Sequence, residues 1–180
     1  MVAAYNARAR NQGLSPAEMH ATQGDLLSPS PPPIPGLFDL AAVGAGFHHF
    51  ADPGLAARRL AERLKPGGVL MVVDFLLEDG QGHGHGHGRG QGLGHNHGGA
   101  HTVMHHGFTE AGMRDMFAAA GAGKDFRLEI VGRGWLGGRE EGWVECKEGE
   151  EGEEEEKEKE GGDGKRGFKT TLFMARGTKV

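Results

Sequence analysis

Cysteine is nearly missing from this chain of 180 residues, because Cys146 is the only one. A disulfide framework and a cysteine zinc site are therefore excluded. Long apolar runs are missing too, since no stretch of about eighteen apolar residues could serve as a membrane span. Residues 1–12, MVAAYNARARNQ, are too polar for a secretory signal, and we interpret them as an ordinary helix rather than a transit peptide. We expect a reducing compartment, the cytoplasm, with nucleus and mitochondrion left open.

An excess of basic charge is also missing. The formal net charge is −5, but residues 139–166 hold thirteen acidic and six basic side chains, a net of −7. The other residues therefore sum to −5 + 7 = +2, which is close to neutral. Such a surface gives no sign of a nucleic-acid partner. We expect a small-molecule substrate and neither nucleic acid nor membrane as a partner.

The central stretch, residues 38–77, predicts a strand, a helix and a second strand. Apolar runs over 38–44 and 69–77 are typical of parallel strands that are buried on both faces. Between them, Asp52-Pro53 is a helix start, because Asp caps free amides and Pro is tolerated at the first helical position. Pro66-Gly67-Gly68 ends the helix. This βαβ unit predicts an α/β sheet.

The flanking segments add further elements. We expect a helix over 2–12, a short strand over 18–26, a Pro-rich linker over 28–36 and a helix over 108–120. Residues 125–136 alternate in polarity and predict an antiparallel or edge strand. A last strand over 168–176 would complete a C-terminal antiparallel hairpin.

Two biased tracts interrupt this pattern, and we expect both to be disordered loops. The first, 79–107, is rich in Gly and His, and the second, 139–166, is rich in Glu. Clustered imidazoles such as His83, His85 and His87 are weak candidates for a metal site, although low-complexity drift in a tolerant loop explains them more simply. The Glu-rich tract is interpreted as solvated, with a basic partner as the alternative.

Four motifs in order carry a family resemblance. Gly24-Asp25-Leu26, the HHxxDP of residues 48–53, the LKPGG of residues 64–68 and the GFTEAG of residues 107–112 resemble the class I S-adenosylmethionine-dependent methyltransferases. The arrangement is similar to the UbiE-like, small-molecule type. The resemblance implies that 1–180 is a single, partial methyltransferase domain of α/β, Rossmann-like fold.

The resemblance also implies site residues. Gly24, Asp25 and Leu26 match the motif whose acidic residue contacts the adenine of S-adenosylmethionine. Gly44, Ala45 and Gly46 would lie beside the cofactor, where small residues allow close approach, although packing alone would also explain them. His48 and His49 are weak catalytic candidates, and a packing corner before the helix is the alternative.

One family feature has no counterpart here. Nothing in the chain reads DxGxGxG, and residue 1 aligns after the family's second strand. We therefore expect a sheet without the first two strands, which leaves the order 4-5-7-6 and one open edge. Strand 18–26 could collapse onto that edge, another chain could pair with it by self-association, or the remnant could be unstable. The function implied is methyl transfer to a small molecule; the alternative is an inactive fragment or pseudoenzyme that acts as an interaction or metal-binding module.

Overall fold

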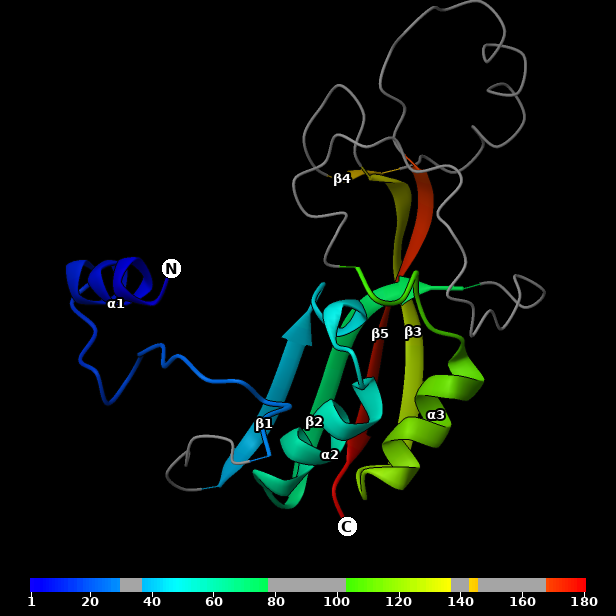
Figure 1. The fold of residues 1–180 in the computed structure, drawn as a ribbon, viewed down its shortest axis with the longest axis horizontal. Helices are drawn as coiled ribbons and strands as arrows, with labels where there is room; N and C mark the ends of the chain where they lie inside the picture. Colours follow the sequence, from blue (N-terminus) through cyan, green and yellow to red (C-terminus); the bar gives the residue numbers. More distant parts are fainter. Residues whose placement is uncertain (30–36, 78–102, 137–142, 146–167) are drawn as a thin grey trace, which may run out of the picture. The chain divides into compact units, whose positions relative to one another are not determined.

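The computed structural model describes residues 1–29, 37–77, 103–136, 143–145 and 168–180 (Figure 1). The chain divides into two compact units, Met1–Pro35 and Gly36–Val180, and each is described by itself. The predicted single domain stays a prediction. The larger parts of the linker and of the two biased tracts lie outside the described residues.

The first unit is built on α1 (Val2–Asn11), which agrees with the predicted helix. Its Ala9 is buried, and Asn6 fixes the chain that follows by two bonds: its amide donates to Ala21 O at 3.1 Å and its Oδ1 accepts from Ala21 N at 2.6 Å. The predicted strand over 18–26 is wrong, because these residues form turns and extended backbone without a strand. No described strand pairs with them, so a side chain rather than a sheet ladder satisfies the backbone at Ala21.

The second unit is a five-stranded mixed sheet of order β1-β2-β5-β3-β4 (Figure 1). The strands are β1 (Phe38–Gly44), β2 (Leu64–Leu76), β3 (Lys124–Leu136), β4 (Trp143–Glu145) and β5 (Phe168–Thr178). β1 and β2 are parallel, whereas β5 runs antiparallel to both β2 and β3. The predicted α/β class and C-terminal hairpin are confirmed. β4 corrects one detail, since it lies in the tract predicted to be disordered.

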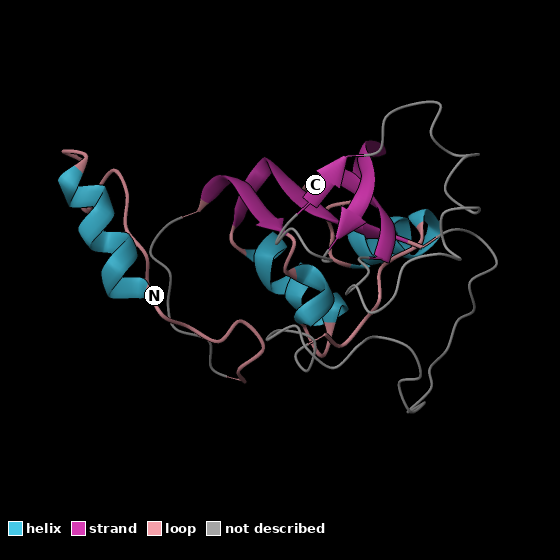
Figure 2. Cartoon of the chain, turned by 90° about the horizontal axis from the view of Figure 1, so that it is seen from above, coloured by secondary structure: helices cyan, strands magenta, loops and turns pink. Residues whose placement is uncertain are grey.

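Two helices lie on one face of this sheet, α2 (Pro53–Glu62) and α3 (Glu110–Ala119), as Figures 1 and 2 show together. Asp52 caps α2 by accepting from Leu55 N at 2.8 Å, as its position before Pro53 predicts. Under the helices, the core contains fully buried side chains from both helices and both central strands: Ala57, Leu64, Leu70, Val72, Met113, Phe117 and Phe173. The helices therefore bury the Leu70 face of β2.

Burial of β1 on both faces is a prediction that proves wrong. Among the described strands β1 lies at one edge of the sheet, and Phe38 and Leu40 are 42% and 52% exposed. Within Gly36–Val180, no described helix covers the face opposite α2 and α3 (Figure 2). The apolar run predicted the strand correctly, but its surroundings depend on which strands lie beside it.

The KPGG turn is the other local difference. These residues lie inside the bounds of β2, although Gly67 has the positive φ of 79° that a turn requires.

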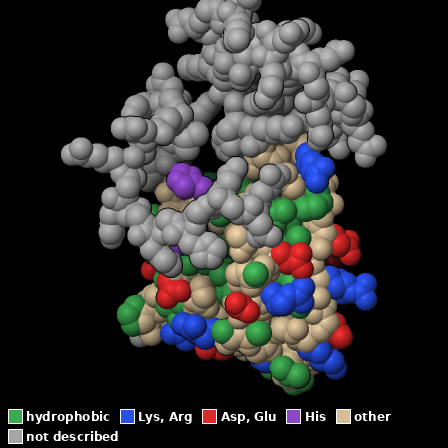
Figure 3. Space-filling model, turned by 90° about the vertical axis from the view of Figure 1, so that its right-hand side faces the viewer, with side chains coloured by type: hydrophobic (Ala, Val, Ile, Leu, Met, Phe, Trp, Pro, Cys, Tyr) green, Lys and Arg blue, Asp and Glu red, His purple; other side chains and the backbone are tan. Residues whose placement is uncertain are grey.

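No described helix is both long enough and apolar enough to cross a membrane. On the face that carries α3 and β3, acidic and basic side chains are interspersed (Figure 3).

Candidate functional site

The chain makes a sharp corner where β1 ends, at the carboxyl end of the two parallel strands. Ala45 has a φ of 48°, a left-handed conformation that is uncommon for a residue with a side chain. Its N–H donates to Val73 O of β2 at 2.8 Å, which holds it in place. A short 3-10 helix, η1 (Phe47–His49), follows directly. Ligands of open α/β sheets bind at this end of the strands.

Asp74 of β2 holds the corner in place by hydrogen bonds. The residue is fully buried, and its Oδ2 accepts the backbone N–H groups of Phe47 and His48 at 2.9 and 3.1 Å. Its Oδ1 accepts from Phe75 N and contacts His48 Nδ1, both at 2.8 Å. A buried carboxylate is stable only when donors surround it. Asp74 thus fixes both the backbone of η1 and the ring of His48.

His48 is the centre of this arrangement and is only 6% exposed. Its ring lies 4.1 Å from that of His49 and 5.0 Å from that of Phe75, measured between centroids. Its carbonyl oxygen accepts from the N–H groups of Met104 and His105, both at 3.1 Å. Residues 103–107 of the predicted disordered tract are therefore placed against η1. This geometry agrees with His48 as a packing and hydrogen-bonding residue of the corner. Its role as a catalytic residue stays a prediction.

Gly44 and Gly46 have little packing that would demand a glycine. A Cβ atom added at Gly44 meets nothing within 4 Å, and one added at Gly46 meets only Gly44 O and a methyl group of Val43, at 3.6 and 3.8 Å. The latter distances are ordinary van der Waals contacts. Among the described residues, packing therefore does not explain why this corner has no side chains at these two positions.

The second group of predicted cofactor residues, Gly24, Asp25 and Leu26, belongs to the first unit. Asp25 is exposed, and its Oδ1 accepts from Leu27 N at 2.9 Å. This bond makes an Asx turn, the simplest role of an Asp after an extended segment. The turn uses one carboxylate oxygen, so the second is not needed for it.

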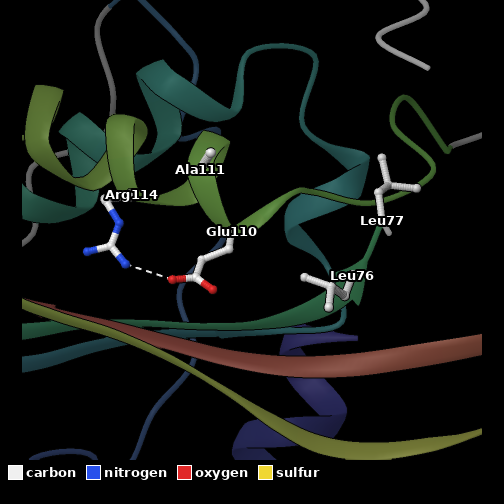
Figure 4. Close-up of a pocket in the computed structure, with 5 residues that line it drawn as sticks. All are labelled: Leu76, Leu77, Glu110, Ala111 and Arg114. Carbon is white, nitrogen blue, oxygen red and sulfur yellow. Dashed lines mark hydrogen bonds and ion pairs between the residues drawn. The ribbon is translucent and has the colours of Figure 1, made fainter. Parts of the chain in front are cut away.

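A cavity of about 380 Å³ lies at the end of β2 beside the start of α3 (Figure 4). Leu76, Leu77 and Ala111 provide its apolar wall, and Glu110 and Arg114 its polar side. The two charged groups pair with each other at 2.7 Å, so each already has a partner. This cavity offers shape and apolar area more than unsatisfied polar groups.

Asp74 is the residue whose role the sequence analysis missed. In the sequence it is a single charge inside an apolar strand. That pattern is itself a signal, because an acidic residue is rarely fully buried unless it is paired. His83, His85 and His87 lie outside the described residues, and the described residues contain no group of three or more side chains suited to hold a metal ion.

Comparisons with known proteins found one matching family model and several similar solved structures. Residues 1–72 match a family model described as a methyltransferase domain. A search of curated proteins found no match. Among solved structures, the chain is similar to the YcgJ protein from Bacillus subtilis, with 18% identity and a TM-score of 0.62 over 99% of this chain and 78% of that one.

A second solved structure, the 4+2 cyclase SpnF, has 22% identity and a TM-score of 0.48; the match covers 75% of this chain, which spans 41% of the cyclase's length. The likeness to YcgJ shows the fold, and the family match shows sequence similarity to methyltransferase domains over residues 1–72. The mixed α/β sheet accordingly resembles the methyltransferase fold.

Proposed function

We propose that this chain belongs to an enzyme that transfers a methyl group from S-adenosylmethionine to a small molecule. The observation that carries the proposal is the corner at Gly44–Gly46. It lies at the carboxyl end of a parallel strand pair, it contains the left-handed Ala45, and it has no Cβ atom at two positions where packing would allow one. Strained, side-chain-free backbone of this kind is typical of sites where a ligand comes close.

The residues present fit such a cofactor. Gly44, Ala45 and Gly46 would contact it through backbone atoms. The role that the resemblance assigns to Asp25, in the first unit, stays a prediction. When bound, the cofactor supplies a methyl group activated on a sulfonium. The chain's own part is then to bind and to align, because methyl transfer depends mainly on the geometry of donor and acceptor.

His48 contributes by holding that geometry. Its ring is clamped by Asp74 on one side and by His49 and Phe75 on the others. If Nδ1 carries the proton that Asp74 accepts, Nε2 is the acceptor nitrogen of the ring. It could then take a proton from a methyl acceptor, although the reaction does not require an obligatory base.

A titration of the full chain with S-adenosylmethionine tests the proposal. Binding is expected in the wild type. Gly44→Val should weaken it at least about tenfold, a loss of about 1.4 kcal/mol, because the added side chain fills the space beside the corner. Asp39→Asn is the control for a substitution in β1 away from the corner, since Asp39 is exposed and lies at the other end of β1.

Urea unfolding of Gly44→Val checks that the fold survives, because a Cβ at this position meets nothing. Wild-type affinity in Gly44→Val would contradict the assignment of the corner. Absence of cofactor binding by the wild-type chain, both alone and fused to a strand that carries the glycine-rich loop of a class I methyltransferase, would overturn the function itself.

The alternative is that this chain is inactive, and the edge at β1 is the observation behind it. In the family that the sequence resembles, another strand pairs here, and the described residues supply none. A pseudoenzyme that acts as an interaction or metal-binding module would show neither cofactor binding nor turnover in the experiments above. Turnover by the chain would exclude it.

A further inference from the structure

We propose that the methyl acceptor is a hydroxyl compound of the phenol class, that His48 Nε2 takes its proton, and that Asp74 is the positioning residue for this imidazole. The inference rests on the proposed function and adds the substrate class to it. Its starting point is the contact of 2.8 Å between Asp74 Oδ1 and His48 Nδ1, which joins a fully buried carboxylate to a buried ring.

Asp74 leaves the Nδ1 atom of His48 only one role. The two oxygens of Asp74 accept three backbone N–H groups, those of Phe47, His48 and Phe75. A carboxylate surrounded in this way is an acceptor, so the Nδ1 atom that contacts Oδ1 is a donor. In a neutral imidazole with its proton on Nδ1, Nε2 carries the lone pair. The pair therefore fixes the tautomer whose Nε2 accepts a proton.

Nε2 of His48 is also open to a ligand. No described residue bonds to it, and it is not one of the described side-chain atoms that are buried without a partner. Those atoms are Arg59 Nε and His105 Nε2, so the nearby His105 has its own Nε2 closed off. The His48 side chain as a whole is only 7% exposed. A packed ring with an accessible acceptor nitrogen suits proton transfer from a bound molecule.

Two consecutive residues of β2 hold both parts of the site. Val73 O accepts from Ala45 N at 2.8 Å, and Asp74, the next residue, accepts from the backbone of Phe47 and His48. The corner proposed to meet the cofactor and the ring proposed to meet the acceptor are thus fixed to neighbouring positions of one strand. Methyl transfer depends on this kind of alignment.

The chemistry of a fixed base selects the acceptor class. A carboxylate is already ionised at neutral pH and an amine attacks through its own lone pair, whereas a phenol, with an ordinary pKa of about 10, still holds its proton. His48 Nε2 receives that proton as the O–H bond breaks, while the oxygen bonds to the methyl group and sulfur keeps the electron pair of the broken methyl–sulfur bond. The positive charge passes from the sulfonium to the imidazolium, which Asp74 stabilises.

Nitrogen NMR of the full chain tests the tautomer without cofactor or turnover. With ¹⁵N-labelled histidine at about pH 8, where free imidazole is neutral, the ring shifts report which nitrogen carries the proton. His48→Asn identifies the His48 signals, and its amide can still donate to Asp74. We expect the proton on Nδ1 in the wild type and on Nε2 in Asp74→Asn. An Nε2–H tautomer or an imidazolium in the wild type would overturn the proposal, and an unchanged tautomer in Asp74→Asn would refute the role of Asp74.

Methylation of three matched probes, phenol, benzoate and aniline, tests the substrate class in the full chain. We expect the methyl ether as the main product. His48→Asn should lower kcat for phenol at least about a hundredfold and leave the affinity for S-adenosylmethionine within about twofold, because only the base is lost. His20→Asn is the control for loss of an imidazole elsewhere, since His20 is an exposed histidine of the first unit.

The outcomes separate this inference from the proposed function. Cofactor binding without methylation of phenol, equal rates with benzoate or aniline, or a wild-type kcat in His48→Asn would each overturn the acceptor class and leave the proposed cofactor site standing. Absence of cofactor binding in the titration described above would instead refute the proposed function itself.

Discussion

Removal of one carboxylate oxygen from Asp74 is the sharpest test of how the corner is held. Asp74→Asn keeps the size and shape of the side chain but replaces one acceptor by an NH₂ donor. With that NH₂ at the Oδ2 position, it faces the N–H groups of Phe47 and His48. At the Oδ1 position it faces Phe75 N and His48 Nδ1.

The two orientations bound the expected loss. An unsatisfied buried donor costs about 1–3 kcal/mol. At the Oδ1 position, the His48 ring can move its own proton to Nε2, so that the bond from Phe75 N is the one lost, at a cost of about 1–3 kcal/mol. At the Oδ2 position two backbone donors lose their acceptor, and the cost rises to about 2–6 kcal/mol. Loss of the charge weakens the remaining bonds as well, so we expect about 2–4 kcal/mol of lost stability.

Urea unfolding of the full chain, followed by circular dichroism, measures this difference. Asp39→Asn is the control, because its carboxylate is also paired but its side chain is 85% exposed. An exposed ion pair contributes at most about 1 kcal/mol. If Asp74→Asn cost no more than this control, the buried carboxylate would not be the anchor of η1, and the reasoning would fail.

Two further substitutions test the packing and the first unit. Gly177→Ala in β5 should lower the free energy of unfolding by about 1–3 kcal/mol, because its Cβ would overlap the carbonyl oxygen of Ala122 and lie 2.9 Å from Phe117 Cδ1. Thermal unfolding measures this loss, with Gly44→Ala, where space is open, as the control. A loss no larger than that of Gly44→Ala would refute the overlap. In the first unit, hydrogen bonds from Ser15 Oγ and Ser15 N lower the pKa of Glu18 below its ordinary value of 4.5. A lowered pKa in the folded unit means that this contribution to stability is present above pH 4.5 and is lost as the pH falls through the folded pKa. Carboxyl titration followed by NMR should give a pKa below 4.5 that moves back toward 4.5 in Ser15→Ala, and an unchanged pKa in that variant would count against the hydroxyl as its main cause.

Local chemistry determined much of this protein from sequence alone. Asp52 before Pro53 fixed the start of α2, because the cap needs only neighbouring atoms. The apolar run that begins at Phe38 predicted β1, and alternation over 125–136 predicted the antiparallel β3. The motif order also led to a family resemblance that the match over residues 1–72 supports, and to the sheet order of the four longer strands.

What depends on neighbours far along the chain was decided only by the tertiary structure. Residues 18–26 have strand-like side chains, but a strand needs a partner for its backbone groups, and no described strand provides one. β1 is half-exposed for the same reason, since burial depends on which elements lie beside a strand and not on its composition. Asp74 shows the opposite case: a charge that reads as an interruption of β2 becomes the anchor of η1, because folding brings Phe47 and His48 within hydrogen-bond distance of it.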